Sequence, residues 1–77
     1  MKKIQILGMG CPNCEKLERN ARMAADQLGI EYELVKIKDM NVIMGYGVMV
    51  TPALAIDGVV KSAGKVLSVA EIKAMLG

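Results

Sequence analysis

The hydrophobic pattern changes its period twice within the first half of the chain, and this change restricts the fold more than any other feature of the sequence. Alternation over residues 3–7 predicts a β-strand, which ends at Gly8. Apolar residues recur at helical spacing over residues 12–28, and alternation returns over residues 30–37. A strand, a helix and a second strand of these lengths form a βαβ unit, so the two strands should be parallel and joined by a right-handed crossover.

The second half of the chain predicts a short helix, a hairpin and a closing helix. Residues 39–45 form the short helix, capped by the aspartate that opens the segment. Asp57-Gly58 is a two-residue hairpin signal that joins predicted strands over residues 53–56 and 59–61. Residues 68–76 begin with a serine followed three residues later by a glutamate, a capping box that opens a helix. The expected element order is therefore β-α-β-α-β-β-α.

Length and composition exclude several classes of protein. With 77 residues the chain has room for a single domain, residues 1–77, with one core. A hydrophobic content of 53% and a net charge of +2 are typical of a soluble globular protein. No basic cluster is interleaved with stacking aromatic residues, and no apolar run approaches the length of a membrane span or a signal peptide. We expect a cytoplasmic monomer without nucleic-acid or membrane partners.

Two cysteines, Cys11 and Cys14, stand where the first strand gives way to the first helix. This position puts Cys11 at or just before the helix N-cap, where unpaired N–H groups and the helix dipole stabilise an anion. A thiolate is the nucleophile in disulfide exchange, so a lowered pKa makes a thiol more reactive at neutral pH. Cys14 shares the apolar stripe of Leu17 and Ala21, and we expect it to be shielded and within reach of Cys11. The pattern predicts that Cys11 attacks and that Cys14 resolves the mixed disulfide.

The residues next to the cysteines bear on the same chemistry. Pro12 sets the backbone of the first helical residue and removes one N–H, which leaves the N–H groups of Asn13 and Cys14 to solvate a thiolate. Glu15 is a nearby negative charge and opposes the anion. Residues 8–10, Gly-Met-Gly, are predicted to be a flexible connection between the strand and the motif.

Other uses of a C-x-x-C pair stay open at this point. A structural disulfide would close a very short loop, which gives little stabilisation. The pattern Met9-x-Cys11-x-x-Cys14 is similar to that of small heavy-metal-associated domains, which bind soft Cu(I) through two thiolates. Those domains have the order β-α-β-β-α-β and end in a strand, whereas this chain is predicted to end in a helix. A Cu(I) or Zn(II) binding module is the main alternative, and an unreactive interaction protein is a third.

Several features together resemble the thioredoxin superfamily, and in particular its small thioredoxin- and glutaredoxin-like redox-active disulfide proteins. They are the C-P-N-C motif after a first strand, Thr51-Pro52 before a third strand, the Asp57-Gly58 hairpin and the closing helix. The resemblance covers residues 3–76. It implies a minimal thioredoxin-like α/β fold, with a central four-stranded mixed sheet flanked by helices.

The same resemblance implies a thiol–disulfide oxidoreductase with no cofactor beyond the Cys11–Cys14 disulfide. Its partners would be disulfide-containing client proteins and an electron donor of the thioredoxin-reductase type. Cys11 carries over as the nucleophile, Cys14 as the resolving cysteine and Pro52 as the cis-proline beside them. An extended client segment would pair with the backbone of Thr51 and add against Val50 as a short strand. The expected substrate-binding residues are Pro12, Val50, Thr51 and Pro52, and no metal ligand is expected.

The sequence departs from the superfamily pattern at three places. Gly10 stands where thioredoxins carry an aromatic residue before the first cysteine. Residues 4–7 contain no acid, although thioredoxins carry a buried acid on this strand that accepts the proton of the resolving thiol. Water or another group then has to accept that proton. Residues 62–65 contain one glycine and no acid, unlike the glutathione-binding turn of glutaredoxins, so we expect a protein reductase as electron donor.

Overall fold

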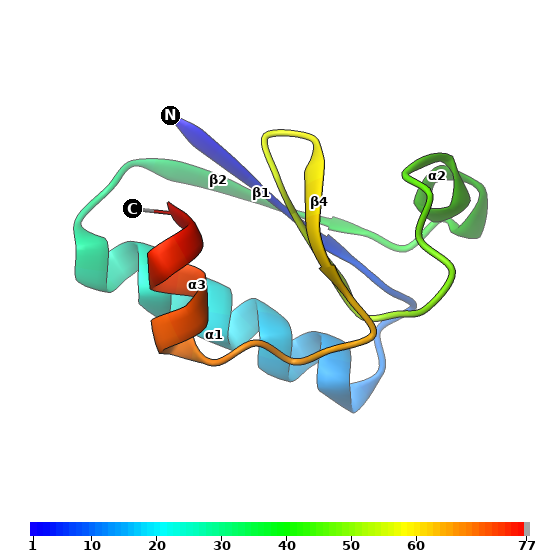
Figure 1. The fold of residues 1–77 in the computed structure, drawn as a ribbon, viewed down its shortest axis with the longest axis horizontal. Helices are drawn as coiled ribbons and strands as arrows, with labels where there is room; N and C mark the ends of the chain where they lie inside the picture. Colours follow the sequence, from blue (N-terminus) through cyan, green and yellow to red (C-terminus); the bar gives the residue numbers. More distant parts are fainter. Residues whose placement is uncertain (77) are drawn as a thin grey trace.

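The fold is built around one mixed β-sheet with helices packed against it (Figure 1). The computed structural model describes residues 1–76. Its elements follow in the order β-α-β-α-β-β-α, which confirms the order predicted from the sequence. They are β1 (Lys2–Leu7), α1 (Pro12–Leu28), β2 (Tyr32–Ile37), α2 (Met40–Gly45), β3 (Ala53–Ile56), β4 (Val59–Ala63) and α3 (Val69–Leu76).

The predicted βαβ unit opens the fold. β1 and β2 are parallel neighbours, in register from Lys2 opposite Tyr32 to Leu7 opposite Ile37. β3 pairs with the other edge of β1 and β4 pairs with β3, both antiparallel, so the sheet order is β2-β1-β3-β4. The sheet is therefore four-stranded and mixed, as the predicted fold class required.

β1 begins at Lys2, one residue earlier than predicted, and two other strand boundaries differ from the prediction by two residues. β2 begins at Tyr32, two residues late, because the N–H of Ile30 donates back to the carbonyl of Ala25 at 3.4 Å and belongs to the end of α1. β4 runs to Ala63, two residues further than predicted, because that residue still pairs with Ala53 of β3. Both differences come from hydrogen bonds that a pattern of apolar residues does not report.

The predicted caps of α2 and α3 are present. Asp39 precedes α2, and its Oδ1 accepts a hydrogen bond from the N–H of Asn41 at 2.9 Å. Ser68 and Glu71 form the capping box of α3: each backbone N–H donates to the other's side-chain oxygen at 3.2 Å. The two helix starts could be placed from sequence because a cap is a local interaction between residues two or three apart.

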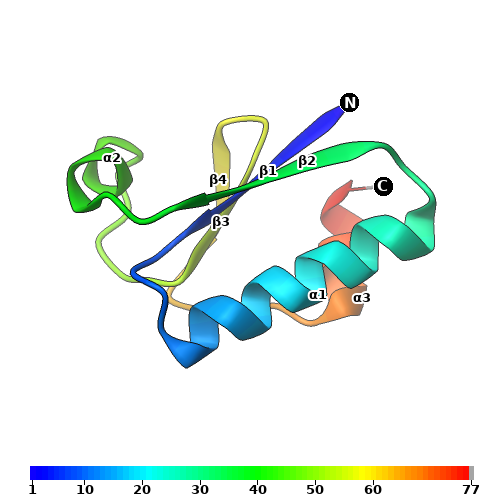
Figure 2. The ribbon, with the colours of Figure 1, turned by 180° about the vertical axis from the view of Figure 1, so that it is seen from behind.

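Apolar side chains pack on both faces of the sheet. On one face they pack against α1 and α3, around Leu17 and Ile72. Leu7 of β1 points to the other face and packs in a smaller cluster with Ile43 of α2. Figure 2 shows α1 and α3 on one side of the sheet and α2 beyond the far end of β2. Within residues 1–76 every helix is too short or too polar to cross a membrane.

Candidate active site

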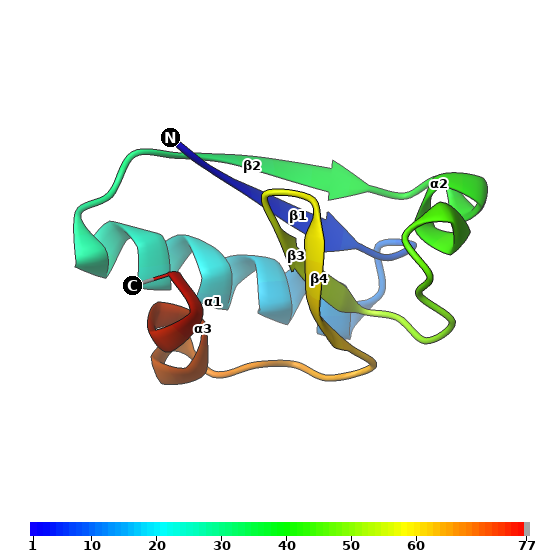
Figure 3. The ribbon, with the colours of Figure 1, turned by 45° about the horizontal axis from the view of Figure 1, so that its top comes forward.

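Two segments that are far apart in the sequence meet at one end of the sheet. β1 and β3 are antiparallel and pair Leu7 with Ala53, so the residues after β1 lie beside the residues before β3 (Figure 3). Gly8 is the point of contact, since a Cβ built on it would lie 3.8 Å from the Cα of Pro52. The cysteine motif and the Thr51-Pro52 dipeptide therefore belong to one site, as the resemblance implied.

The two cysteines are free thiols at the start of α1. Cys11 is the N-cap residue, as predicted, and its sulfur accepts a hydrogen bond from the N–H of Cys14 at 3.4 Å. The two Sγ atoms lie 2.8 Å apart. Cys14 is only 5% exposed, whereas Cys11 is half-buried and reachable from solvent. Since a disulfide bond is about 2.05 Å long, the pair can close with a small movement.

The environment moves the pKa values of the two thiols in opposite directions. The pKa of Cys11 is lowered, first by the hydrogen bond from the Cys14 thiol and then by the one from the Cys14 N–H. The pKa of Cys14 is raised, first by burial and then because its proton is held in the hydrogen bond to Cys11. The sequence argument gave the helix N-terminus as the cause of a lowered pKa. In the structure the neighbouring thiol is the larger cause and the backbone N–H groups come second.

The Thr51–Pro52 peptide bond is cis, as the resemblance implied. Pro52 is buried, and its carbonyl accepts a hydrogen bond from the N–H of Gly64 at 2.8 Å. Thr51 is half-buried and lies two residues before the start of β3 at Ala53. Within the part of the chain that the structure describes, neither backbone polar group of Thr51 bonds to another backbone group.

Three exposed apolar side chains come from the two segments that form the site. Met9 follows β1 and is 59% exposed. Met49 and Val50 precede the cis peptide and are 96% and 58% exposed. We call these three residues the apolar rim. Pro12, the fourth predicted substrate-binding residue besides Val50, Thr51 and Pro52, is exposed at the first position of α1.

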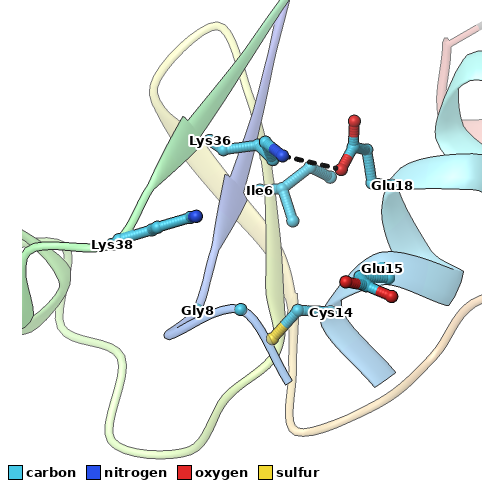
Figure 4. Close-up of a pocket in the computed structure, with 8 residues that line it drawn as sticks. Ile6, Gly8, Cys14, Glu15, Glu18, Lys36 and Lys38 are labelled. Atoms are coloured by element: carbon cyan, nitrogen blue, oxygen red, sulfur yellow. Dashed lines mark ion pairs between the residues drawn. The ribbon is translucent and has the colours of Figure 1, made fainter. Parts of the chain in front are cut away.

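A pocket of about 70 Å³ opens beside Cys14 (Figure 4). Its polar lining comes from α1 and from the end of β2, and the nearest ion pair joins Lys36 Nζ to Glu18 Oε1 at 3.4 Å. Burial alone would raise the pKa of Glu18, but the hydrogen bond from Arg22 and the charge of Lys36 lower it below its ordinary value. The i,i+4 spacing of Glu18 and Arg22 in the sequence is that of a helical ion pair, and this pair is present at 3.0 Å. Helical spacing gives no signal for the Lys36–Glu18 pair, because Lys36 lies on β2.

The glycines before the motif have separate structural reasons. Gly10 has a φ of +88°, a conformation that side chains rarely adopt, so glycine replaces the expected aromatic residue there. Gly8 is buried, and its N–H donates to the carbonyl of Ile37 at 3.0 Å, which continues the β1–β2 hydrogen-bond ladder. The prediction of a flexible connection over residues 8–10 is therefore wrong for Gly8.

Comparison with known proteins agrees with this geometry. A family model described as a thioredoxin domain matches residues 2–77. A thioredoxin of Methanothermobacter thermautotrophicus is 51% identical over 76 residues, which cover 99% of each chain. A thioredoxin of Methanocaldococcus jannaschii is 45% identical over 73 residues, which cover 95% of this chain and 84% of the relative. The chain therefore belongs to the thioredoxin domain family and is a thiol–disulfide oxidoreductase.

Proposed function

We propose that this protein reduces disulfide bonds in other proteins by dithiol exchange, with Cys11 as the nucleophile and Cys14 as the resolving thiol. The observation that carries the proposal is the asymmetry of the pair. The two sulfurs are 2.8 Å apart, yet the pKa of the accessible thiol is lowered and the pKa of the buried thiol is raised. A metal-binding pair needs two thiolates together, whereas a redox pair needs one thiolate and one held proton.

In the first step the Cys11 thiolate attacks one sulfur of the client disulfide. A bond forms between Cys11 Sγ and that sulfur, the client S–S bond breaks, and the other client sulfur leaves as a thiolate that takes a proton from water. The hydrogen bond from the Cys14 thiol stabilises the attacking thiolate before the reaction. That support is no longer needed once Cys11 is covalently bound.

In the second step Cys14 loses its proton and attacks Cys11 Sγ. The Cys11–Cys14 disulfide forms, the mixed disulfide breaks, and the second client sulfur leaves as a thiolate and is protonated. The proton of Cys14 passes to water in the adjoining pocket, whose volume of about 70 Å³ is large enough to hold water. In total, two electrons pass from the cysteine pair to the client disulfide.

The client binds along the segment before β3. An extended client segment pairs with the free backbone groups of Thr51, in the manner of strand addition to a sheet edge. The apolar rim and Pro12 contact the client residues that flank the client disulfide. Exposed apolar side chains grouped around a reactive thiol are typical of a surface that binds another protein.

Regeneration requires a second protein. The oxidised pair accepts two electrons from a dithiol reductase of the thioredoxin-reductase type, and no cofactor other than the cysteine pair takes part. A reducing compartment such as the cytoplasm would keep the pair ready for the next client. Residues 62–65, at the end of β4 and just after it, include no acid with which to hold the amino group of glutathione.

The test is a count of free thiols in the protein and in a disulfide-bonded client such as insulin. We expect two thiols to disappear from the protein as two appear in the client, and dithiothreitol to restore the starting state. The reduction potential should lie at roughly −200 to −300 mV. Tight binding of one Cu(I) or Zn(II) without thiol exchange would favour the metal module, and neither reaction would favour an unreactive scaffold.

A further inference from the structure

Gly8 lies against the sulfur of the resolving cysteine. An ideal Cβ placed on Gly8 would collide with Cys14 Sγ. The same Cβ would lie 3.4 Å from Cys14 Cβ and 3.8 Å from Pro52 Cα, which are ordinary van der Waals distances. The sulfur atom is thus the obstacle to a side chain at residue 8, and the neighbouring backbone is not.

Backbone conformation does not explain this glycine. The φ of Gly8 lies outside the left-handed region, in contrast to Gly10, which needs glycine for its φ of +88°. Gly45 matches Gly8 in this respect, because its φ is also outside that region, but a Cβ on Gly45 would meet nothing within 4 Å. Gly45 is therefore a control for the φ of Gly8 without the contact with Cys14 Sγ, and it lies exposed at the end of α2 whereas Gly8 is buried.

We propose that Gly8 is a positioning residue for the second exchange step: the space left by its missing side chain holds the Cys14 thiol next to Cys11. The proposal rests on the proposed function, since it assigns a role to Gly8 in the resolving reaction. A methyl group at residue 8 would force Cys14 Sγ to rotate or the start of α1 to shift, and the 2.8 Å separation of the sulfurs would grow. Reacting atoms need to approach to about 3–3.5 Å, so a displaced thiol resolves the mixed disulfide slowly.

The kinetic test compares Gly8→Ala with the control Gly45→Ala, using one equivalent of an aromatic disulfide that releases a coloured thiolate at each step. Cys11 releases the first thiolate and Cys14 the second. We expect the Gly45→Ala variant to match the original protein in both steps. In the Gly8→Ala variant the first release should slow severalfold at most, because Cys11 loses part of its hydrogen bond with Cys14. The second release should slow about tenfold or more, so that a mixed disulfide accumulates. Unchanged release of the second thiolate would overturn the proposal.

A thermodynamic test uses the stability of the intramolecular disulfide. If the Cys14 thiol is displaced, the equilibrium constant for oxidation against dithiothreitol should fall about tenfold in the Gly8→Ala variant, which corresponds to a potential about 30 mV more oxidising. A role of Gly8 in general packing would lower the unfolding midpoint and leave this potential unchanged.

A double-mutant cycle measures the contact through unfolding equilibria, so it is informative even if the Gly8→Ala variant is destabilised. Gly8→Ala is made in the original chain and in a Cys14→Ala chain, where the obstructing sulfur is absent, and unfolding by urea is followed in all four proteins. The substitution should raise the unfolding equilibrium constant about tenfold more in the chain that keeps Cys14. Equal effects in both chains would contradict the contact between Gly8 and the sulfur.

The outcomes separate this inference from the function on which it rests. An original protein that releases neither thiolate would contradict the proposed function, and the urea cycle would still decide whether Cys14 Sγ is the obstacle at residue 8. An original protein and a Gly8→Ala variant that release both thiolates equally fast would support the function and overturn the inference.

Discussion

The two ends of the sheet differ in how far their polar groups are hydrogen-bonded within the chain. At the end that carries the β3–β4 hairpin, the N–H of Asp57 donates to the carbonyl of Lys3 at 2.7 Å, and the N–H of Lys3 returns a bond to Asp57 Oδ1 at 2.9 Å. The buried side chain of Gln5 accepts a hydrogen bond from the N–H of Gly58 at 3.2 Å. The turn is therefore closed by hydrogen bonds within the chain.

At the opposite end, the same sheet leaves groups without a partner. Thr51 makes no backbone–backbone hydrogen bond within the described residues 1–76, and the apolar rim is exposed around it. Cys14 is buried, and its Sγ lies 2.8 Å from Cys11 Sγ. The comparison shows that one end of the sheet closes its polar groups by hydrogen bonds within the chain, whereas the other end carries the cysteine pair and exposed apolar side chains. This is the arrangement expected when a rigid scaffold positions reactive loops.

Removal of the attacking sulfur, at the active-site end of the sheet, should give the largest loss of turnover with little loss of stability. The Cys11→Ser variant should lose more than about 100-fold in disulfide-reductase turnover, because no thiolate remains to start the exchange. Its unfolding midpoint in urea should stay close to that of the original protein, since Cys11 is not part of the core. Cys14→Ser should also stop turnover but should trap mixed disulfides with clients. If Cys11→Ser traps clients and Cys14→Ser does not, the assigned roles are reversed.

The pH dependence of thiol alkylation tests the asymmetry within the site. Because the thiolate reacts, the rate at each cysteine rises with pH through the pKa of that thiol. The midpoint for Cys11 should lie below that of a free cysteine, and the midpoint for Cys14 above it. Cys14→Ala removes the main hydrogen bond to the Cys11 sulfur, so the Cys11 pKa should rise and its alkylation at pH 7 should slow severalfold. An unchanged Cys11 profile in that variant would mean that backbone N–H groups alone lower the pKa.

A substitution at the hairpin should change stability without changing the chemistry. Gly58 has a φ of +84°, next to Asp57 at +52°, so Gly58→Ala forces a side chain into the left-handed region. The variant should lose about 1 kcal/mol of stability, which is about 4–8 °C in Tm for a domain of this size. Turnover per folded molecule should be unchanged. A loss of turnover at temperatures where the variant is folded would contradict the separation of the two ends.

A substitution in the apolar rim should give the smallest effect. In contrast to the hairpin substitution, it should change client turnover and leave stability unchanged. Met49 is 96% exposed, so Met49→Ser should leave the Tm within about 1 °C. The kcat/KM for a protein client should fall about twofold to threefold through KM, while the rate with a small aromatic disulfide stays constant. Met44→Ser is the matched control, since Met44 is 63% exposed but lies on α2, outside the rim. Equal effects from both variants would exclude the rim as the client surface.

Much of this fold could be predicted because its signals are local. The change in hydrophobic period located β1, α1 and β2, and the Asp39 and Ser68 caps located two helix starts, since each depends on residues a few positions apart. The cysteine pair belongs to the same class. Residues three apart at the start of a helix are neighbours whatever the rest of the chain does.

The sequence by itself determined the element order, the helix caps and the meeting of the two thiols, because these follow from backbone geometry over short spans. The tertiary structure decided which distant residues join them. The approach of Gly8 to Pro52 depends on β3 pairing with β1, and the Lys36–Glu18 ion pair depends on where α1 crosses the sheet. The contact between Gly8 and the Cys14 sulfur leaves no room for even one methyl group, so it depends on how closely the folded chain packs there. A periodic pattern contains no information at that scale, whereas close packing of the folded chain sets it.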